Sequence, residues 1–403
     1  MKRLAVLSLA LLSLASPGTA RAAGYLIYDL SGEALGKASG VVASTREPAA
    51  VWFNPAALTE MGHGVSLGGV AVFARSRFEP EAGGEDIETE PANHLLPAAF
   101  ATAKVHDRVA VGFGAFPAFG LSIEWPEDWV GREAAIKAEV ETFNLNPTVA
   151  VRLLPGLSLG VGFQAVRAAV EFINGLPAVV GGTARLGGST WGYGGNAAVL
   201  FQPQMVPQLA FGLTYRSRVK LEFTGRVDFD PGSPDFEPSL PDQGGTAELT
   251  LPDILSFGSA WQVAPAVALT FDVNYVLWST YDELVVDFDQ APDLVQIRDN
   301  KNAFTLRLGV DWSTPIEGLS VRGGLILDQN PSPSENLAPS LPDANRLDFG
   351  AGVGYRWRWA RADLGYLLVY FLPSDSTTGA EGPVGTYKSL AQLLGLTLTA
   401  SFD

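Results

Sequence analysis

The sequence predicts an all-β protein: a transmembrane antiparallel β-barrel of about 14 strands with an N-terminal hatch, or plug, inside the lumen. Three observations lead to this fold class. Segments of about ten residues alternate apolar and polar side chains, most clearly toward the C-terminus. Aromatic residues recur near the ends of these segments, as in the interfacial girdles of barrels. Beyond the first residues no apolar run reaches the roughly 18 residues of a transmembrane helix, which leaves a closed barrel to span a membrane.

The first residues have the pattern of an export signal. Lys2 and Arg3 form a positive start, residues 4–15 are apolar, and Ala20-Arg21-Ala22 is an A-x-A cleavage site. The alternative is a buried N-terminal helix. We predict a signal peptide at 1–22, a hatch at 23–62 and a transmembrane β-barrel at 63–403.

The strands are predicted from segments in which every second residue is apolar. In the segments 304–312, 319–328, 347–359 and 394–402, one face is apolar and the other polar or small. A soluble β-sandwich is the alternative, but sandwich strands are usually shorter. The expected strands start near Gly64, Pro97, Arg108, Glu139, Leu157, Thr183, Gln208, Ala247, Ala266, Asn302, Leu319, Arg346, Ala362 and Leu390.

Composition excludes several classes of site. The chain has a formal net charge of −16, which argues against nucleic acid as a partner, and no cysteine for a disulfide or a thiolate metal site. No metal-ligand cluster or phosphate-binding loop stands out, so we expect neither metal nor cofactor. The acidic outer loops at 228–245 and 287–301 fit simple solvation better than a binding site.

Residues 23–61 do not alternate and are rich in glycine, alanine and serine. Small residues allow backbones to approach closely, as a compact segment inside a barrel requires. We interpret this segment as the plug.

Three regions resemble the FadL-type outer-membrane transporters of long-chain fatty acids and aromatic hydrocarbons. The first runs from Gly24-Tyr25 to Asn54-Pro55-Ala56, the second begins with Leu251-Pro252-Asp253, and the third extends from Arg322-Gly323-Gly324 to Gly352-Val353-Gly354-Tyr355. Together they span nearly the whole mature chain.

The resemblance implies a monomer in the outer membrane of a Gram-negative cell, in contact with outer-membrane lipid. It implies passive uptake of a hydrophobic ligand, a fatty acid or hydrocarbon, which is captured at the outer loops and bound inside the barrel. The ligand would leave through the wall where the third strand kinks inward, near the Asn-Pro-Ala part of the hatch.

Several residues are candidates for parts of this route. Pro117 lies in the third strand, expected from Val109 to about Phe119, where proline removes a donor and forces a break; alternatively it only ends the strand. Asn54, Pro55 and Ala56 could hold the hatch against the wall, although Asn-Pro also marks ordinary turns.

Other residues are candidates for contact with the ligand. The resemblance implies that Tyr25, near the start of the hatch, couples the hatch to the ligand site inside the barrel. Trp125 and Trp129, followed by a short helix at 132–140, suggest an exposed apolar surface for substrate capture, or anchors in lipid. Five arginines expected in the lumen are candidates to bind a carboxylate: Arg152, Arg307, Arg322, Arg356 and Arg358. The alternative, expected more often for each of them, is an ion pair with a lumen aspartate such as Asp311, Asp328 or Asp348.

An enzyme is not expected. The three histidines, His63, His94 and His106, show no spacing with serine and an acid that would form a catalytic triad. The alternatives to a hydrophobic transporter are a general diffusion porin and a surface adhesin barrel. Small apolar lumen positions such as Ala110, Gly112 and Gly160 argue against a water-filled porin.

Overall fold

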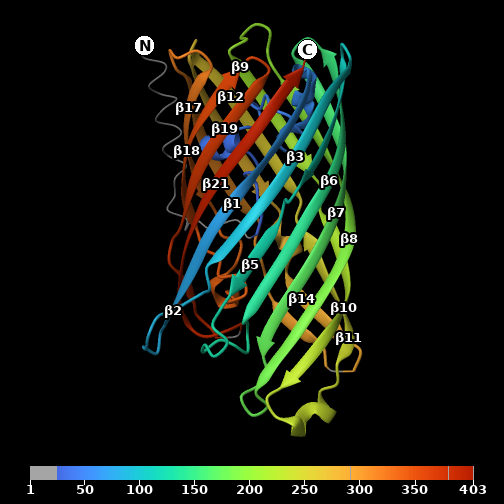
Figure 1. Ribbon diagram of the computed structural model, residues 1–403, viewed down its shortest axis with the longest axis vertical. Helices are drawn as coiled ribbons and strands as arrows, with labels where there is room; N and C mark the ends of the chain where they lie inside the picture. Colours follow the sequence, from blue (N-terminus) through green and yellow to red (C-terminus); the bar gives the residue numbers. More distant parts are fainter. Residues whose placement is uncertain (1–24, 291, 380, 403) are drawn as a thin grey trace.

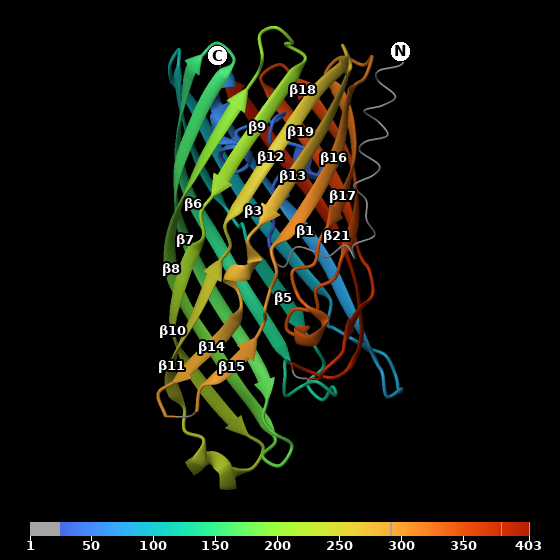
Figure 2. The same ribbon diagram turned by 180° about the vertical axis from the view of Figure 1, so that it is seen from behind.

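The computed structural model describes residues 25–290, 292–379 and 381–402. Within these residues the strands form one sheet with antiparallel neighbours. Strand β1 (His63–Pro80) pairs with β3 (Ala92–His106) on one side and with β21 (Gly385–Phe402) on the other. The sheet therefore closes into a barrel, which Figures 1 and 2 show from opposite sides.

In the described part of the chain the wall consists of fourteen strands, as predicted. Most wall strands are continuous: β1, β3, β6 (Lys137–Leu154), β7 (Leu157–Gly175), β8 (Gly182–Phe201), β17 (Leu319–Asp328), β18 (Arg346–Trp357), β19 (Ala360–Phe371) and β21. The others consist of two pieces: β4 (Val109–Phe116) with β5 (Gly120–Glu124), β9 (Leu209–Arg216) with β10 (Val219–Pro231), β11 (Gln243–Leu251) with β12 (Ile254–Ala264), β13 (Val267–Val276) with β14 (Glu283–Phe288), and β15 (Leu294–Ile297) with β16 (Ala303–Ser313). Short β2 (Ile87–Glu88) and β20 (Ser374–Ser376) extend the sheet.

The two faces of the wall differ as the alternation predicts. In β16, Phe304, Leu306 and Leu308 are 49%, 39% and 53% exposed, whereas Thr305 and Arg307 are buried. The outward side chains are apolar, as a lipid-facing surface requires, and the inward ones line the lumen. No helix among the described residues is long and apolar enough to cross a membrane.

The two ends of the barrel also differ. Short turns gather at the end where the chain terminates (Figure 1), and exposed tryptophans lie at or next to the strand ends there: Trp261, Trp312, Trp357 and Trp359. Longer connections form the opposite end, with the 3₁₀ helices η2 (Pro234–Ser239) and η4 (Ser334–Asn336). We call these the short-turn end and the long-loop end.

Residues 25–61, the hatch segment, lie inside the barrel toward the short-turn end (Figure 2). The segment contains α2 (Gly32–Gly36), α3 (Ala50–Phe53) and the 3₁₀ helix η1 (Pro55–Glu60), and most of its side chains are buried. It contacts β4, β6, β7 and β8 on one side and β17, β18, β19 and β21 on the other. The predicted signal peptide, 1–22, lies outside the described residues.

Wall glycines make this close fit possible. A Cβ atom at any of seven wall positions would lie 2.7 Å or less from the hatch backbone. These positions, the glycine cradle, are Gly160, Gly212, Gly309, Gly324, Gly350, Gly352 and Gly365. Side chains at these positions would collide with the hatch, because backbone atoms cannot move aside as a flexible side chain can.

The predicted helix at 132–140 is wrong. Residues 127–134 form turns and a bend, and β6 begins at Lys137. The reason is pairing: Lys137 lies opposite Ile173 of β7, and the backbone N–H of Ile136 donates to the carbonyl of Ile173 at 2.8 Å. The sheet thus takes the backbone groups that a helix would need.

Candidate functional site

The third wall strand is interrupted at residues 117–119. β4 ends at Phe116 and β5 begins at Gly120, so Pro117, which has no backbone N–H, lies in the break. β4 pairs with β3 over Ala99–His106, but among the described residues β5 pairs only with β6. The earlier part of β3 therefore has no ladder partner on this side, and the wall is open between β3 and β5.

A cavity of about 570 Å³ lies behind this opening. We call it the wall cavity. Leu95 and Leu96 of β3 line it together with Pro117 and Phe119, and the hatch residues 25–29 form its inner side. Leu95 is 70% exposed, which places this edge of the cavity at the outer surface of the barrel. The volume lies within the roughly 300–1,000 Å³ of typical small-molecule sites.

The start of the hatch segment covers the break in the third strand. Leu26 forms an antiparallel bridge with Phe119. The N–H of Ile27 donates to the carbonyl of Ala118 at 2.9 Å, and the N–H of Gly120 donates to the carbonyl of Tyr25 at 3.0 Å. The hatch thus bonds backbone groups that the missing ladder leaves open, and its position is coupled to that of the break.

Tyr25 stands at the centre of an aromatic cluster. Its ring lies 5.9 Å from Phe119, 5.0 Å from Trp278 and 6.2 Å from Tyr281, all edge-on. The hydroxyl of Tyr25 and the indole N–H of Trp278 are buried without a hydrogen-bond partner. Burial, followed by the neighbouring Tyr281, raises the pKa of Tyr25 well above its ordinary value, so this phenol stays protonated.

A second, smaller pocket of about 40 Å³ adjoins the wall cavity. We call it the inner pocket. Four residues line both spaces and separate them: Tyr25, Leu121, Val140 and Leu341. The rest of the inner pocket is mainly apolar, with Phe172, Phe223 and Leu249, but Arg298 and Ser340 add polar groups at its surface.

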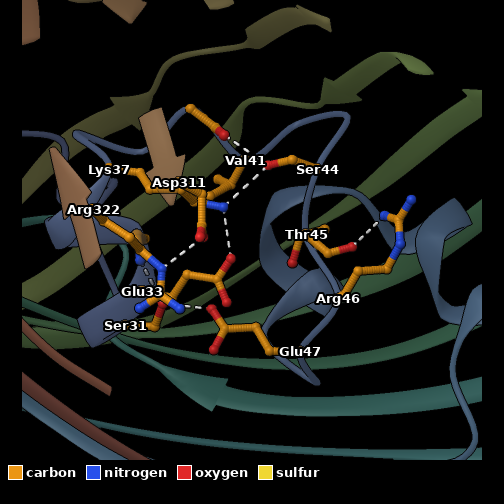
Figure 3. Close-up of polar contacts among 12 residues, drawn as sticks. Ser31, Glu33, Lys37, Val41, Ser44, Thr45, Arg46, Glu47, Asp311 and Arg322 are labelled. Atoms are coloured by element: carbon orange, nitrogen blue, oxygen red, sulfur yellow. Dashed lines mark hydrogen bonds and ion pairs between the residues drawn. The ribbon is translucent and has the colours of Figure 1, made fainter. Parts of the chain in front are cut away.

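Buried ion pairs fasten the hatch to the wall. Lys37 donates to Glu33 at 2.6 Å, and Arg361 of β19 donates to the other oxygen of Glu33. Arg322 of β17 bonds Asp363 at 2.7 Å and Asp311 at 2.8 Å. Figure 3 shows part of this hatch ion network, with Lys37 and Arg322 around Glu33.

Glu47 lies beside the hatch ion network. One carboxylate oxygen each of Glu33, Glu47 and Asp363 lie within 4.8 Å of one another. Ser31 Oγ donates to one oxygen of Glu47 at 2.5 Å (Figure 3), and the other oxygen has no partner. Burial, together with the charge of Glu33, raises the pKa of Glu47 to about 7.

Glu33 shifts the other way. Burial alone would raise its pKa, but the positive charges of Arg361 and Lys37 outweigh burial and hold the pKa well below its usual range. Arg361 and Lys37 therefore supply the positive charge that balances the Glu33 carboxylate.

Asn54, Pro55 and Ala56 join the hatch to the wall. The amide of Asn54 donates to Val42 O at 2.7 Å within the hatch and to Val199 O of β8 at 3.3 Å, and its oxygen accepts from Ala56 N–H. Pro55 and Ala56 pack against Gly160 of β7. These contacts fall on β7 and β8, not on residues 117–119; Tyr25 to Ile27 make the contact with the break instead.

The arginines expected to bind a carboxylate do not line the inner pocket. Arg152 pairs with Glu60 at 3.0 Å, Arg307 with Asp29 at 3.3 Å, and Arg322 with Asp311 and Asp363. Arg307 does line the wall cavity, but Asp29 holds it. Arg356 and Arg358 lie at the short-turn end, where Arg358 stacks over Trp357.

The arginine that lines the inner pocket, Arg298, was missed. It follows β15 in a connection where apolar and polar residues do not alternate, so the sequence pattern does not indicate that this side chain is buried.

The prediction of an exposed tryptophan pair is wrong. Trp125 and Trp129 are only 1% and 4% exposed, and their rings stack at 4.5 Å. The indole N–H of Trp125 donates to the carbonyl of Pro339, which belongs to the loop 329–345, and that of Trp129 donates to Ala135 O. Loops that are distant in sequence fold over the pair, which therefore packs the long-loop end and offers no open surface.

Comparisons with known proteins agree with this architecture. Residues 13–402 match the family described as "Outer membrane protein transport protein (OMPP1/FadL/TodX)". The chain is 28% identical over 397 residues to the long-chain fatty acid transport protein of Salmonella typhi and 26% identical over 408 residues to that of Escherichia coli (strain K12). Both alignments cover 90% of each protein.

Solved structures show the same fold. A Pseudomonas aeruginosa FadL homologue superposes with a TM-score of 0.84 at 18% identity, over 94% of this chain and 100% of that one. The P. putida toluene transporter TodX gives 0.72 at 15% identity, over 91% and 98%. Relatives include the outer membrane protein P1 of Haemophilus influenzae, at 27% identity over 473 residues and 100% of both chains. With a family match along nearly its whole length, this chain belongs to the OMPP1/FadL/TodX family of outer membrane transport proteins.

Proposed function

We propose that the protein carries hydrophobic molecules, long-chain fatty acids or related hydrocarbons, passively into the cell and releases them sideways through its wall. The single observation behind this proposal is the wall cavity, which joins the start of the hatch to the opening between β3 and β5. Relatives named as long-chain fatty acid transport proteins, and a structural neighbour named as a toluene transporter, support this choice of cargo.

The proposed route starts at the long-loop end, taken as extracellular. Cargo enters the inner pocket, displaces Tyr25 and its neighbours, and passes into the wall cavity. It then leaves between β3 and β5 into the lipid. Release into lipid suits an apolar molecule, because each Å² of apolar surface kept from water favours transfer by about 25 cal/mol. One barrel contains the whole route, so a monomer suffices.

The firm attachment of the hatch favours exit through the wall over exit past the hatch. Withdrawal of the hatch would break the buried ion pair between Glu33 and Arg361 and leave Arg361 with Asp363 alone as its partner. Sideways release requires only a shift of residues 25–27 at the break. In this proposal Pro117 keeps the ladder open, Tyr25 senses the cargo, and Asn54, Pro55 and Ala56 hold the rest of the hatch in place.

The proposal is tested by filling the opening. Leu96 lines the wall cavity from β3, so Leu96→Trp places a larger side chain in the path of the cargo. We expect uptake of radiolabelled palmitate, in cells without another such transporter, to fall by about tenfold or more, because the substitution blocks the exit. Leu306→Trp, on the outer surface of β16, is the matched control and should transport normally. Normal uptake by a correctly assembled Leu96→Trp barrel would refute sideways exit.

A general diffusion porin and a surface adhesin remain the alternatives. The buried hatch inside the lumen speaks against a porin, since a porin needs a polar, water-filled channel. A deletion strain that loses uptake of small hydrophilic solutes, yet takes up fatty acids and hydrocarbons normally, would favour the porin.

A further inference from the structure

The opening between β3 and β5 is closed at both of its ends. Toward the short-turn end, Ala99 of β3 lies opposite Ala115 of β4 in a paired ladder. Toward the long-loop end, the backbone N–H of Glu90 donates to the carbonyl of Glu124, the last residue of β5, at 2.8 Å. The opening is therefore a window inside the wall and not a slit that runs to the end of the barrel.

The two edges of this window have the same length. The steps along the chain from Ala99 to Glu90 and from Ala115 to Glu124 are equal, so neither edge gains a residue over the other. In an antiparallel ladder each residue lies opposite one partner. The window is thus an interruption of a single ladder, and its two edges are already aligned to pair with each other.

Two prolines face each other where the ladder stops. Continued past Ala99 and Ala115, the same register places Pro97 of β3 opposite Pro117. Neither proline has a backbone N–H, so neither can donate to the other strand. On its other side β3 pairs with β1 through Gly69 and Pro97 without a shift of register. A proline is tolerated in a strand where its nitrogen faces no partner, and the free edge of β3 at the window is such a place.

The hatch occupies part of the window as a substitute strand. Just beyond Pro117, the carbonyl of Ala118 accepts from Ile27, and the N–H of Gly120 donates to Tyr25. These contacts end when residues 25–27 shift, and the third strand then has a free edge beside the free edge of β3. The missing N–H groups of the prolines, in contrast, are permanent. They act at the moment when the hatch no longer separates the two edges.

We propose that Pro97 is a positioning residue for sideways release: opposite Pro117, it prevents the two edges of the window from closing into a ladder when the hatch shifts. This inference rests on the proposed function. An unpaired edge strand is a ready template for a strand beside it, so a window between two aligned edges persists only where their pairing is blocked. The exit is therefore held open from β3 as well as from the third strand.

The test restores the missing donors. In Pro97→Val/Pro117→Val both positions carry a backbone N–H and a side chain that favours strands. Hydrogen exchange of amides in residues 92–98 and 116–123 is measured by mass spectrometry on the full chain in detergent. We expect protection to rise by about tenfold over the wild type, because one or two hydrogen bonds are gained. Palmitate uptake, in cells without another such transporter, should fall by about fivefold or more as the exit narrows.

Two further variants serve as comparisons. Pro97→Val alone should change protection and uptake in the same direction but less, because Pro117 still lacks its donor. Pro147→Val is the matched control. Pro147 lies in β6 opposite Phe113 of β4, in a part of the wall that is already paired, so its replacement should leave the protection of both segments and the uptake unchanged.

The two measurements separate the possible failures. A gain of protection distinguishes pairing across the window from a merely structural role of Pro97, since a destabilised wall would exchange faster. Unchanged or faster exchange in an assembled double variant overturns the inference about Pro97 and leaves the proposed function standing. If the double variant does not assemble, Pro97→Val alone decides by the same measure. Slower exchange with normal uptake would show that transport does not need the window, and would refute the proposed function.

Discussion

At the scale of single residues, Glu47 carries the least compensated carboxyl of the hatch. Glu33 is held by Lys37 and Arg361, whereas Glu47 receives one hydrogen bond from Ser31 and has one oxygen without a partner. The pKa of Glu47 is raised from an ordinary 4.5 to about 7, first by burial and then by the charge of Glu33. The docked hatch therefore binds this proton more strongly than a free chain does.

This proton links the attachment of the hatch to pH. Because the pKa is higher in the docked state, the stabilisation is complete below about pH 4.5 and is lost as pH rises toward about 7. Glu47→Gln keeps the shape but stays neutral, so above pH 7 it should stabilise docking by up to about 3 kcal/mol. Hydrogen exchange of amides in residues 25–61 measures this difference. Equal protection of the two proteins at pH 8 would contradict it, and no difference is expected near pH 4.5.

At the scale of elements, the hatch segment and the wall fit through the glycine cradle. At Gly365 of β19 a Cβ atom would lie 2.3 Å from the carbonyl oxygen of Gly32 and 2.8 Å from Leu35 Cβ. At Gly323 of β17, outside the cradle, it would lie 3.7 Å from its nearest neighbour, Val310 Cγ1. The two positions form a matched pair on similar strands.

Gly365→Ala should loosen the hatch without opening the barrel. The added methyl meets backbone atoms, so we expect a loss of about 1–3 kcal/mol in hatch docking, typical of overpacking. Limited proteolysis should then cut within residues 25–61 faster than in the wild type, while the barrel remains resistant. Gly323→Ala should behave as the wild type. Faster cleavage in both variants would show that the effect is not one of hatch contact.

The sequence predicted the wall strands well for a physical reason. Each strand must present one face to lipid and the other to the lumen, so the alternation that placed strands near Leu157 and Leu319 had to be present. The observed β7 and β17 start at those residues. The ion pair considered for Arg322 as an alternative to ligand binding is also observed. Arg322 and Asp311 lie opposite each other in neighbouring strands and form this pair.

The remaining errors come from contacts that alternation does not encode. Trp125 and Trp129 are buried because Pro339, more than 200 positions away, reaches them through a loop. Arg298 lies in a connection without periodicity, so its burial depends on how the loops of the long-loop end pack. Pro117 did mark the break in the third strand, since the chemistry of proline is local.

At the scale of the whole molecule, the hatch and the wall together determine how much of the lumen is free. A wall of this size encloses more space than its own side chains fill, and residues 25–61 occupy the lumen toward the short-turn end.

Removal of residues 25–61 should therefore turn the protein into an aqueous pore. In planar bilayers the wild type should show little steady conductance, whereas the deletion variant should conduct ions in large, stable steps. A deletion variant that folds but does not conduct would indicate that other segments close the lumen.

The glycine cradle also bears on how such proteins diverge. Seven wall positions accept the hatch only while they lack side chains, and the hatch backbone must follow one path to use them. Neither partner can change shape alone, so substitutions in the two are expected to be inherited together. A hatch transplanted from a relative at 26% identity should seat only where the wall glycines of that relative are transplanted with it.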